Sequence, residues 1–281
     1  LNDTTALPHV TYYYWIQAVN DAGASLYSAS ASGSLRNPIS AMFACDFNAD
    51  GAAEMTVAGA GTWFALSASN SVTLWNEVWG YAGVQPVVGD YDGDGVSDMA
   101  VFDSASGNWF IRKPSGAILA WAVPWGWPSA EPVPGDFDGD GMSDLAVYDN
   151  ATGAWYIRTL DNRVLAWAKP WGWPGATTVP GDFDGDGAAD LAVYDNASGA
   201  WYAQRLDGGV IAWGISWGWL GATPVSGDYD GDGVSDLAVY DALTGKWYVQ
   251  AVNGSVIVWD VAWGGPGATP VPADYDGDGA W

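Results

Sequence analysis

Acidic residues recur along this chain in a nine-residue loop of the pattern Asp-x-Asp-x-Asp-Gly-x-x-Asp. Complete copies begin 46 residues apart, at Asp90, Asp136, Asp182 and Asp228. A looser copy, DFNADGAAE, begins at Asp46, and a shorter copy, DYDGDG, begins at Asp274. The fixed interval indicates that each loop belongs to one unit of a repeating structure.

The residue types in this loop match the requirements of a calcium site. Carboxylates at positions 1, 3 and 5 of an extended loop point toward a common centre, and glycine at position 6 allows the positive φ that turns the chain back. A backbone carbonyl near position 7 and a carboxylate at position 9 complete an all-oxygen shell. Four carboxylates with no cation among them repel one another unless a divalent ion neutralises them. The predicted ligands of the complete loops are Asp90, Asp92, Asp94, Asp98, Asp136, Asp138, Asp140, Asp144, Asp182, Asp184, Asp186, Asp190, Asp228, Asp230, Asp232 and Asp236.

A single acidic loop is explained equally well as a solvated turn, but four copies in register favour Ca²⁺. We expect weaker binding at the first copy, because Asn48 is neutral and Glu54 has a longer side chain than aspartate. Its predicted ligands are Asp46, Asn48, Asp50 and Glu54. The last copy supplies Asp274, Asp276 and Asp278 and lacks a ninth position. We therefore expect four strong sites, one weak site and one incomplete site.

The charge balance is strongly acidic, with 33 Asp and Glu against 8 Lys and Arg and a net charge of −25. Most of these acids lie in the loops, so the charge serves mainly as metal ligand. Nucleic acid is excluded as a partner, because nothing offers the basic patch that phosphate contacts need. Calcium sites of this kind suit a calcium-rich compartment, so we expect an extracellular or cell-surface protein.

No apolar run in the sequence approaches the length that crosses a membrane. The start of the chain also lacks the segments of a signal peptide, so we expect a mature chain or a fragment. The lone cysteine, Cys45, excludes an internal disulfide. The other copies have glycine or alanine at its position, so we expect a packed thiol rather than a reactive one.

A period of 40 to 50 residues is typical of propellers and solenoids. In the unit that begins at Glu131, strand patterns occur at PVPGD, DLAVYD, AWYIRTL and VLAWAKPW, separated by hairpin-length turns. Four antiparallel strands without a helical period predict a propeller blade in an all-β fold. Complete blades are predicted from Ile39, Gln85, Glu131, Thr177 and Thr223, and a sixth unit, from Thr269, is predicted to add one inner strand and an open loop.

Residues 1–38 have a different pattern. The run VTYYYWIQAVNDAGASLYSASASGS predicts two strands around Asn20 to Gly23. Residues 28–38 are rich in small residues and are predicted to form a linker. The hairpin resembles the last two strands of a fibronectin type III domain. The predicted domains are therefore a partial fibronectin-like hairpin with its linker, residues 1–38, and the propeller repeats, residues 39–281.

Residues 39–281 resemble the FG-GAP or VCBS repeats of integrin-alpha-type propellers, through DFDGDGMSDLAVYD and its copies. The resemblance implies that the loop joins the first two strands of a blade and binds calcium on one rim of the disc. The degenerate first loop, the short sixth unit and the absence of seven visible blades depart from that family. Propellers support adhesion, sugar binding and catalysis alike, so the resemblance implies the fold more than the function.

Tryptophan recurs in phase on the third and fourth predicted strands. We expect these rings to pack between adjacent blades. A second group follows the fourth strand in WGW segments, where exposed rings would stack on sugars or contact another subunit. The candidate contact residues are Trp125, Trp127, Trp171, Trp173, Trp217 and Trp219.

Glycosylation motifs occur at Asn2, Asn150, Asn196 and Asn253. Three lie in predicted hairpin turns, where Asn, Ser and Thr also serve simply as turn formers. Catalysis finds little support, because the only histidine, His9, has no predicted nucleophile beside it. The recurring Asp103, Asp149, Asp195 and Asp241 are explained as residues that start turns.

The sequence favours a non-enzymatic, extracellular, calcium-binding propeller that acts as a structural or adhesive module. Its expected partners are other extracellular proteins or further copies of itself, in a head-to-tail filament. A carbohydrate-binding propeller is the alternative, with the WGW rings as stacking platforms. A polysaccharide-active propeller enzyme is a weaker alternative.

Overall fold

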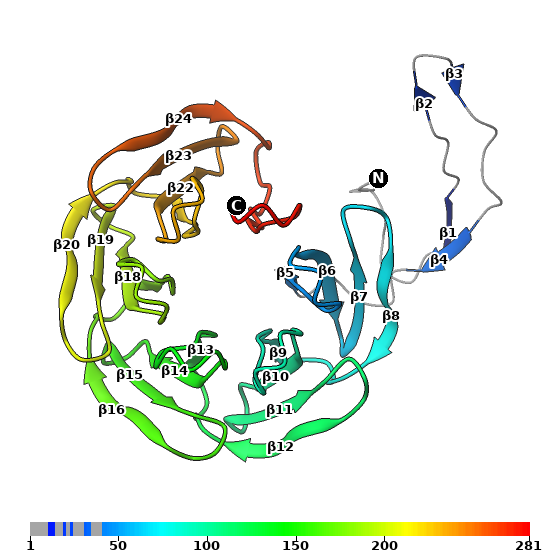
Figure 1. Ribbon diagram of the computed structural model, residues 1–281, viewed down its shortest axis with the longest axis horizontal. Coiled ribbons are helices and arrows are strands. Elements are labelled where there is room, and N and C mark those ends of the chain that lie inside the picture. The colour runs from blue at the N-terminus through cyan, green and yellow to red at the C-terminus, as the bar shows by residue number, and fades with distance from the viewer. Residues whose placement is uncertain (1–10, 15–18, 21–22, 25–30, 35–40) are drawn as a thin grey trace.

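The structure is a computed structural model that describes the backbone of residues 11–14, 19–20, 23–24, 31–34 and 41–281, and the side chains from Cys45 onward. Five four-stranded antiparallel sheets form a ring, and no helix occurs within these ranges. Figure 1 shows the sheets arranged as blades around a central axis, with the first strands innermost and the fourth strands at the periphery. The predicted all-β propeller is confirmed.

The strands follow one another across each sheet in sequence order. The first blade contains β5 (Ala41–Cys45), β6 (Glu54–Gly59), β7 (Thr62–Leu66) and β8 (Val72–Val78). The second contains β9 (Gln85–Pro86), β10 (Met99–Asp103), β11 (Asn108–Arg112) and β12 (Ile118–Pro124), and the third β13 (Glu131–Pro132), β14 (Leu145–Asp149), β15 (Ala154–Arg158) and β16 (Val164–Pro170). The fourth contains β17 (Thr177–Thr178), β18 (Leu191–Asp195), β19 (Ala200–Gln204) and β20 (Val210–Ser216), and the fifth β21 (Thr223–Pro224), β22 (Leu237–Asp241), β23 (Lys246–Gln250) and β24 (Val256–Ala262).

The hydrophobic core lies between neighbouring blades. Tyr148 and Trp155 of the third blade pack in one cluster with Leu191 and Val193 of the fourth, and all four side chains are fully buried. Equivalent clusters join each pair of consecutive blades. Each blade is therefore stabilised by burying apolar area against the next one, as expected of a sheet with two apolar faces.

The predicted inner strand at the start of the sixth unit is wrong. Residues 263–281 are all described, and no strand follows β24 among them. Among residues 263–281 no second strand lies beside the segment from Thr269, and a first strand without a partner cannot form a ladder. The loop that follows it is nevertheless formed, and its Asp274 carbonyl accepts a hydrogen bond from Ala53 N–H of the first blade at 2.7 Å.

The N-terminal segment contains two small antiparallel pairs. Strand β2 (Val19–Asn20) pairs with β3 (Gly23–Ala24), with Asn20 opposite Gly23. Strand β1 (Thr11–Tyr14) pairs with β4 (Ala31–Ser34), so part of the predicted linker is a strand. The likeness to a fibronectin type III domain stays a prediction. The described residues contain no helix long and apolar enough to cross a membrane.

Candidate metal centre

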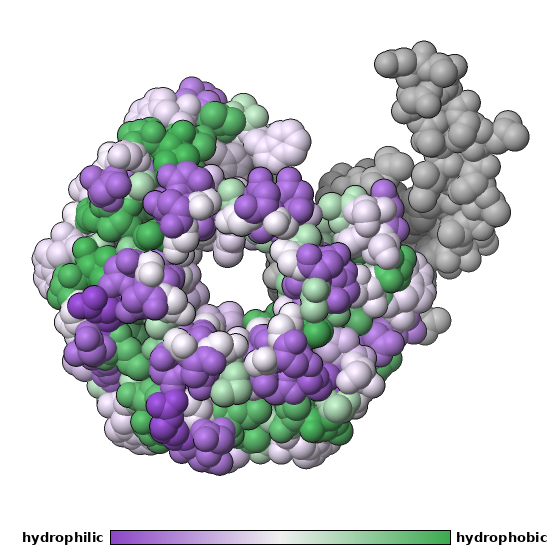
Figure 2. Space-filling view, viewed as in Figure 1, coloured by the Kyte–Doolittle hydropathy of each residue, from purple (hydrophilic) through white to green (hydrophobic). Residues whose placement is uncertain are grey.

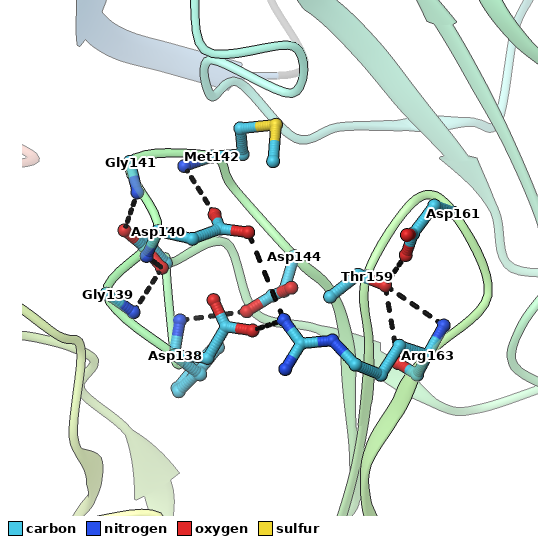
Figure 3. A network of polar contacts seen from close by, with 11 residues as sticks. Asp138, Gly139, Asp140, Gly141, Met142, Asp144, Thr159, Asp161 and Arg163 are labelled. Carbon is cyan, nitrogen blue, oxygen red and sulfur yellow. Dashed lines mark hydrogen bonds and ion pairs between the residues drawn. The ribbon is translucent and has the colours of Figure 1, made fainter.

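The acidic loops connect the first and second strands of the blades. In the third blade, Asp136 organises the turn through both carboxylate oxygens. Its Oδ1 accepts a hydrogen bond from Gly139 N–H at 2.7 Å, and its Oδ2 accepts one from Gly141 N–H at 2.7 Å. Both glycines have positive φ, 72° and 86°, which explains why this turn needs glycine. Figure 3 shows the result, with the carboxylates of Asp138, Asp140 and Asp144 turned toward the interior of the loop.

The ninth-position aspartates are the most deeply buried ligands. Asp144 is 2 % exposed, and its Oδ2 accepts a hydrogen bond from Phe137 N–H at 2.9 Å. Asp98, Asp190 and Asp236 make the same contact with the backbone of the second loop residue. One carboxylate oxygen thus fixes the loop, while the other remains available to a ligand.

The carboxylates converge as the sequence predicts. In each of the five loops beginning at Asp46, Asp90, Asp136, Asp182 and Asp228, one oxygen from each of three carboxylates lies within 4.8 Å of the others. The converging positions are 1, 3 and 9 in the last three of these loops, 1, 3 and 5 in the loop at Asp90, and 1, 5 and 9 in the first loop.

Three buried carboxylate oxygens of the described loops have no hydrogen-bond partner and are available to a cation. Among the described residues, the buried Oδ1 atoms of Asp92, Asp98 and Asp138 have no hydrogen-bond partner. A buried acceptor without a partner costs about 1–3 kcal/mol, and more when it is charged. Hard carboxylate oxygens at this density are the donors that Ca²⁺ prefers. The donor set therefore fits calcium, which would be held by the aspartates of each loop and would neutralise their charge.

The electrostatics of the loops support the same assignment. Burial raises the pKa of Asp144 and of Asp190 to about 7, and that of Asp98 and of Asp236 to about 6. The charges of the other aspartates in each loop add to the effect. Clustered carboxylates without a cation hold protons more tightly, because ionising all of them in a buried site is unfavourable.

Basic side chains reach three of the loops, which the sequence analysis missed. Lys113 Nζ contacts Asp92 Oδ2 at 2.6 Å and Asp94 Oδ2 at 2.5 Å. Arg163 pairs with Asp138, as Figure 3 shows, and Arg205 Nη1 lies 3.0 Å from Asp184 Oδ2.

The nine residues of each of these loops contain no base, and the three basic side chains come from elsewhere in the same blades. Each base follows the third strand of its blade and is therefore far from the loop along the sequence. Its position beside the loop is not apparent from the sequence pattern. Since each of the three loops holds several carboxylates against one base, excess negative charge remains. Among the described residues, no ion pair involves the loop at Asp228.

The first loop differs in the way its substitutions suggest. Glu54 is fully buried, and its Oε2 accepts a hydrogen bond from Phe47 N–H at 2.6 Å. Its Oε1 accepts one from Asn48 Nδ2 at 2.5 Å. The amide of Asn48 thus occupies an acceptor that a metal would otherwise use, which is consistent with a weaker site. Cys45, just before this loop, is buried and contacts Thr56 Oγ1 at 3.2 Å, and burial raises the pKa of its thiol to about 12.

The sixth loop adopts the turn of the complete copies. Asp274 Oδ1 accepts a hydrogen bond from Gly277 N–H at 2.6 Å, and its Oδ2 accepts one from Gly279 N–H at 2.9 Å. Asp278 Oδ1 caps Ala280 N–H at 3.0 Å. The loop conformation therefore does not depend on the ninth residue, whereas the full set of ligands does.

The tryptophans divide into two classes, and only one was predicted correctly. The third-strand rings of the first four blades are buried, with Trp109 and Trp155 0 % exposed and their indole N–H groups bonded to the carbonyls of Trp125 and Trp171, whereas Trp247 of the fifth blade is partly buried. The fourth-strand rings were expected to be buried between blades, but they are exposed. Their exposed fractions are 72 % for Trp75, 66 % for Trp121, 69 % for Trp167, 72 % for Trp213 and 66 % for Trp259. A bulge in each third-to-fourth strand pairing, which the sequence pattern does not reveal, accompanies this arrangement.

The WGW rings are less exposed than a stacking platform requires. Trp125, Trp127, Trp171 and Trp173 are partly buried, Trp217 is buried, and Trp219 is 38 % exposed. Trp127 packs edge-on against Tyr156 of the next blade, with ring centroids 4.9 Å apart. These segments therefore belong mainly to the contacts between blades.

The turn residues have local partners. Asp149 Oδ1 caps Ala151 N–H at 3.0 Å, and Asp103, Asp195 and Asp241 make the equivalent contact, which confirms that they start turns. Among the glycosylation motifs, Asn150 Nδ2 donates to Glu131 at 2.6 Å, and Asn196 Nδ2 donates to Thr177 at 2.8 Å. Asn253 is exposed. Asn2 and His9 lie outside the described residues.

Hydrophilic residues gather around the central opening on the face that Figure 2 presents.

The model of the FG-GAP-like repeat matches residues 90–147, 136–193 and 182–239, which together span more than half of the chain. The chain belongs to the FG-GAP-like repeat family. Each matched repeat begins at the first residue of an acidic loop, at Asp90, Asp136 or Asp182. No curated protein matches the chain in sequence.

Solved structures share the fold of this FG-GAP-like propeller at low sequence identity. A lectin from Agrocybe aegerita that recognises non-reducing terminal N-acetylglucosamine has a TM-score of 0.52 at 16 % identity, over 76 % of this chain and 63 % of the lectin. A catalytically inactive virginiamycin B lyase from Staphylococcus aureus, solved with quinupristin, has a TM-score of 0.52 at 12 % identity, over 93 % of this chain and 78 % of the lyase. These likenesses concern the fold alone.

Proposed function

We propose that this FG-GAP-like propeller is a non-enzymatic, extracellular, calcium-binding module with a structural or adhesive role. The observation that carries the proposal is the repeated convergence of carboxylates, most of them partly or fully buried and some with oxygens that have no protein partner. Calcium in each loop would link the first two strands of a blade and remove the repulsion within the loop. The blades would then form a stiff disc that presents its rim to a partner.

The contacts between loops extend this effect around the ring. Ser143 N–H donates to the Asp90 carbonyl at 2.5 Å, and Ala189 N–H donates to the Asp136 carbonyl at 2.5 Å. A metal-bound loop therefore holds the backbone on which the neighbouring loop rests. Calcium would stabilise the contacts between blades as well as each blade alone.

Calorimetric titration of chelator-treated protein with CaCl₂ tests the proposal. We expect about four tight sites, with much weaker binding of Mg²⁺, because Mg²⁺ requires a smaller and stricter octahedral shell. The matched variant Asp138→Ala should lose one site and leave the others in place. A flat titration, together with thermal melts that coincide in chelator and in calcium, would refute the calcium assignment.

Carbohydrate binding is a second candidate, favoured by the exposed fourth-strand tryptophans. Trp167 packs edge-to-face with Tyr156, with ring centroids 5.3 Å apart, at a hollow of about 260 Å³ that is also lined by Trp125 and Trp127. An exposed indole beside such a hollow suits stacking on a sugar face. The lectin neighbour makes glycans with terminal N-acetylglucosamine a reasonable first probe.

Glycan-array binding by Trp167→Ala and Trp121→Ala tests this candidate. We expect both variants to lose signal while their melting temperatures stay unchanged. Asn150→Ala, which alters the turn after the third blade's second strand, is the control. Retention of all binding by both tryptophan variants would exclude the fourth-strand rings as a platform.

A head-to-tail filament is the form of self-association that we propose for a structural role, because strand addition between chains covers exposed sheet edges. Sedimentation velocity over a wide concentration range tests it. Growing oligomers would support the filament, and a constant monomer mass would rule it out.

A further inference from the structure

The six acidic loops form a closed ring of backbone hydrogen bonds. In each case the N–H of the eighth loop residue donates to the carbonyl of the first residue of another loop. The pairs run Ser97 to Asp46 at 2.6 Å, Ser143 to Asp90 at 2.5 Å, Ala189 to Asp136 at 2.5 Å, Ser235 to Asp182 at 2.5 Å, Trp281 to Asp228 at 2.7 Å, and Ala53 to Asp274 at 2.7 Å. The last two pairs place the sixth loop between the fifth and first blades. The ring therefore has six positions, of which five carry blades.

The face of the fifth blade that borders the sixth position is uncovered. Trp263 is 79 % exposed, whereas its counterpart Trp217 in the fourth blade is 9 % exposed and donates to the Tyr248 carbonyl of the next blade at 3.3 Å. Beneath Trp263 lies an apolar hollow of about 590 Å³, whose lining includes Trp247 and Val261. In the preceding blades, the equivalent surface is filled by the next sheet.

The face of the first blade on the other side of the sixth position is also uncovered. Met55 is 48 % exposed, whereas its counterparts Met99 and Leu145 are 0 % exposed, because they are buried against the preceding blade. Met55 lies at a second apolar hollow, of about 320 Å³, with Phe64 in its lining. Figure 1 shows the ring open between β24 and the first blade.

Both uncovered faces are apolar, like the faces that are buried wherever two consecutive blades pack together. We propose that the sixth position binds a three-stranded antiparallel sheet with the pattern of the second to fourth strands of this repeat. One apolar face of that sheet would cover Trp263, as Leu237 and Val239 cover the fourth blade. Its other face would cover Met55, and its first residue, an acid, would take the ninth position of the loop at Asp274.

A single sheet fits this position better than a second copy of the ring. The sixth loop already occupies the inner end of the sixth position. The space that remains, between the fifth and first blades, is the space that the three outer strands of one blade would fill. A folded disc of five blades is larger than one blade and cannot bring two of its faces into that space. The inference rests on the packing of the blades and is independent of the bound ion.

Extension of the full chain with a copy of its own strands tests the proposal. Residues 190–222 are attached directly after Trp281, so that Asp190 follows in register as the ninth loop residue. The control carries the same 33 residues in scrambled order. Oxidation by hydrogen peroxide is followed by mass spectrometry at Met55, with Met142, which is 37 % exposed on another loop, as the internal reference.

We expect oxidation of Met55 to slow at least tenfold in the extended chain, relative to Met142, and to stay unchanged in the scrambled control. Because the extension could fail to fold in place, a synthetic peptide of residues 190–222 is also added in trans to the unextended chain, and it should give the same protection at saturation. Equal reactivity of Met55 in every sample would overturn the proposal. So would protection of Met55 in the unextended chain that rises with protein concentration and with oligomer mass, because the occupant would then be a second copy.

Discussion

The substitution Asp144→Asn should change the stability of the protein in opposite directions with and without calcium. In the absence of calcium, the Asp144 carboxylate is buried, and its pKa is raised to about 7 from the ordinary 3.8. At pH 7.5, above this pKa, the buried carboxylate is mostly ionised, and the cost of burying its charge has no counterpart in the unfolded chain, so it destabilises the fold. An asparagine amide at this position would keep an oxygen for the Phe137 N–H and remove the charge.

The magnitude follows from the size of the pKa change. One pKa unit corresponds to about 1.4 kcal/mol, and partial screening by solvent reduces the part that is realised. We expect Asp144→Asn to stabilise the calcium-free protein by about 1–2 kcal/mol at pH 7.5. With calcium at roughly 1,000 times the dissociation constant, an occupied site contributes about 4 kcal/mol. A variant that loses this site should then be less stable than the parent by about 2–3 kcal/mol.

Urea unfolding at pH 7.5, monitored by tryptophan fluorescence in chelator and in millimolar calcium, measures both values. Asp149→Asn is the matched control, because Asp149 lies in the same blade and caps a turn outside the metal centre. Its effect should be small and equal in the two conditions. An equal loss of stability by Asp144→Asn in chelator and in calcium would refute the reasoning, since Asp144 would then act only as a backbone acceptor.

Three further outcomes are expected. The raised pKa values of the ninth-position aspartates imply that the calcium-free protein loses stability as the pH rises from about 5 to about 7.5. Its melting temperature should therefore fall over that range, and a rise would contradict the assignment of these aspartates as buried, destabilising charges. In calcium, Asp136→Ala should lower the melting temperature more than Asp46→Ala, because the Asn48 amide already occupies a Glu54 oxygen that would otherwise bind the metal in the first loop. The reverse order would argue against our ranking of the sites. Gly153→Ala should lower the free energy of unfolding by about 2 kcal/mol or more, because the added Cβ would lie 2.4 Å from the Gly172 backbone. Gly175 has a similar positive φ but open space around it, so Gly175→Ala should lower this free energy by less in the same urea titration.

Local patterns in the sequence determined most of this fold. Alternating apolar residues and turn residues predicted each blade in order, because strand formation and hairpin turns depend on neighbours along the chain. The convergence of the loop carboxylates was predictable for the same reason, since the residues of one loop come together without help from elsewhere. The repeat interval then predicted the ring, because identical sheets with two apolar faces must stack on one another.

Contacts between distant segments were decided only by the tertiary structure. The pairing of Arg163 with Asp138 depends on how a hairpin folds back over its own blade, and that distance is not encoded in a local pattern. Trp167 was expected to be buried and Trp125 to be exposed, but the structure shows Trp167 exposed and Trp125 partly buried. Both residues lie in apolar segments of the sequence, and only the packing of the next blade distinguishes them. The closed ring of six loops was also invisible in the sequence. It joins Ala53 to Asp274, and such a contact exists only once the blades have curved into a circle.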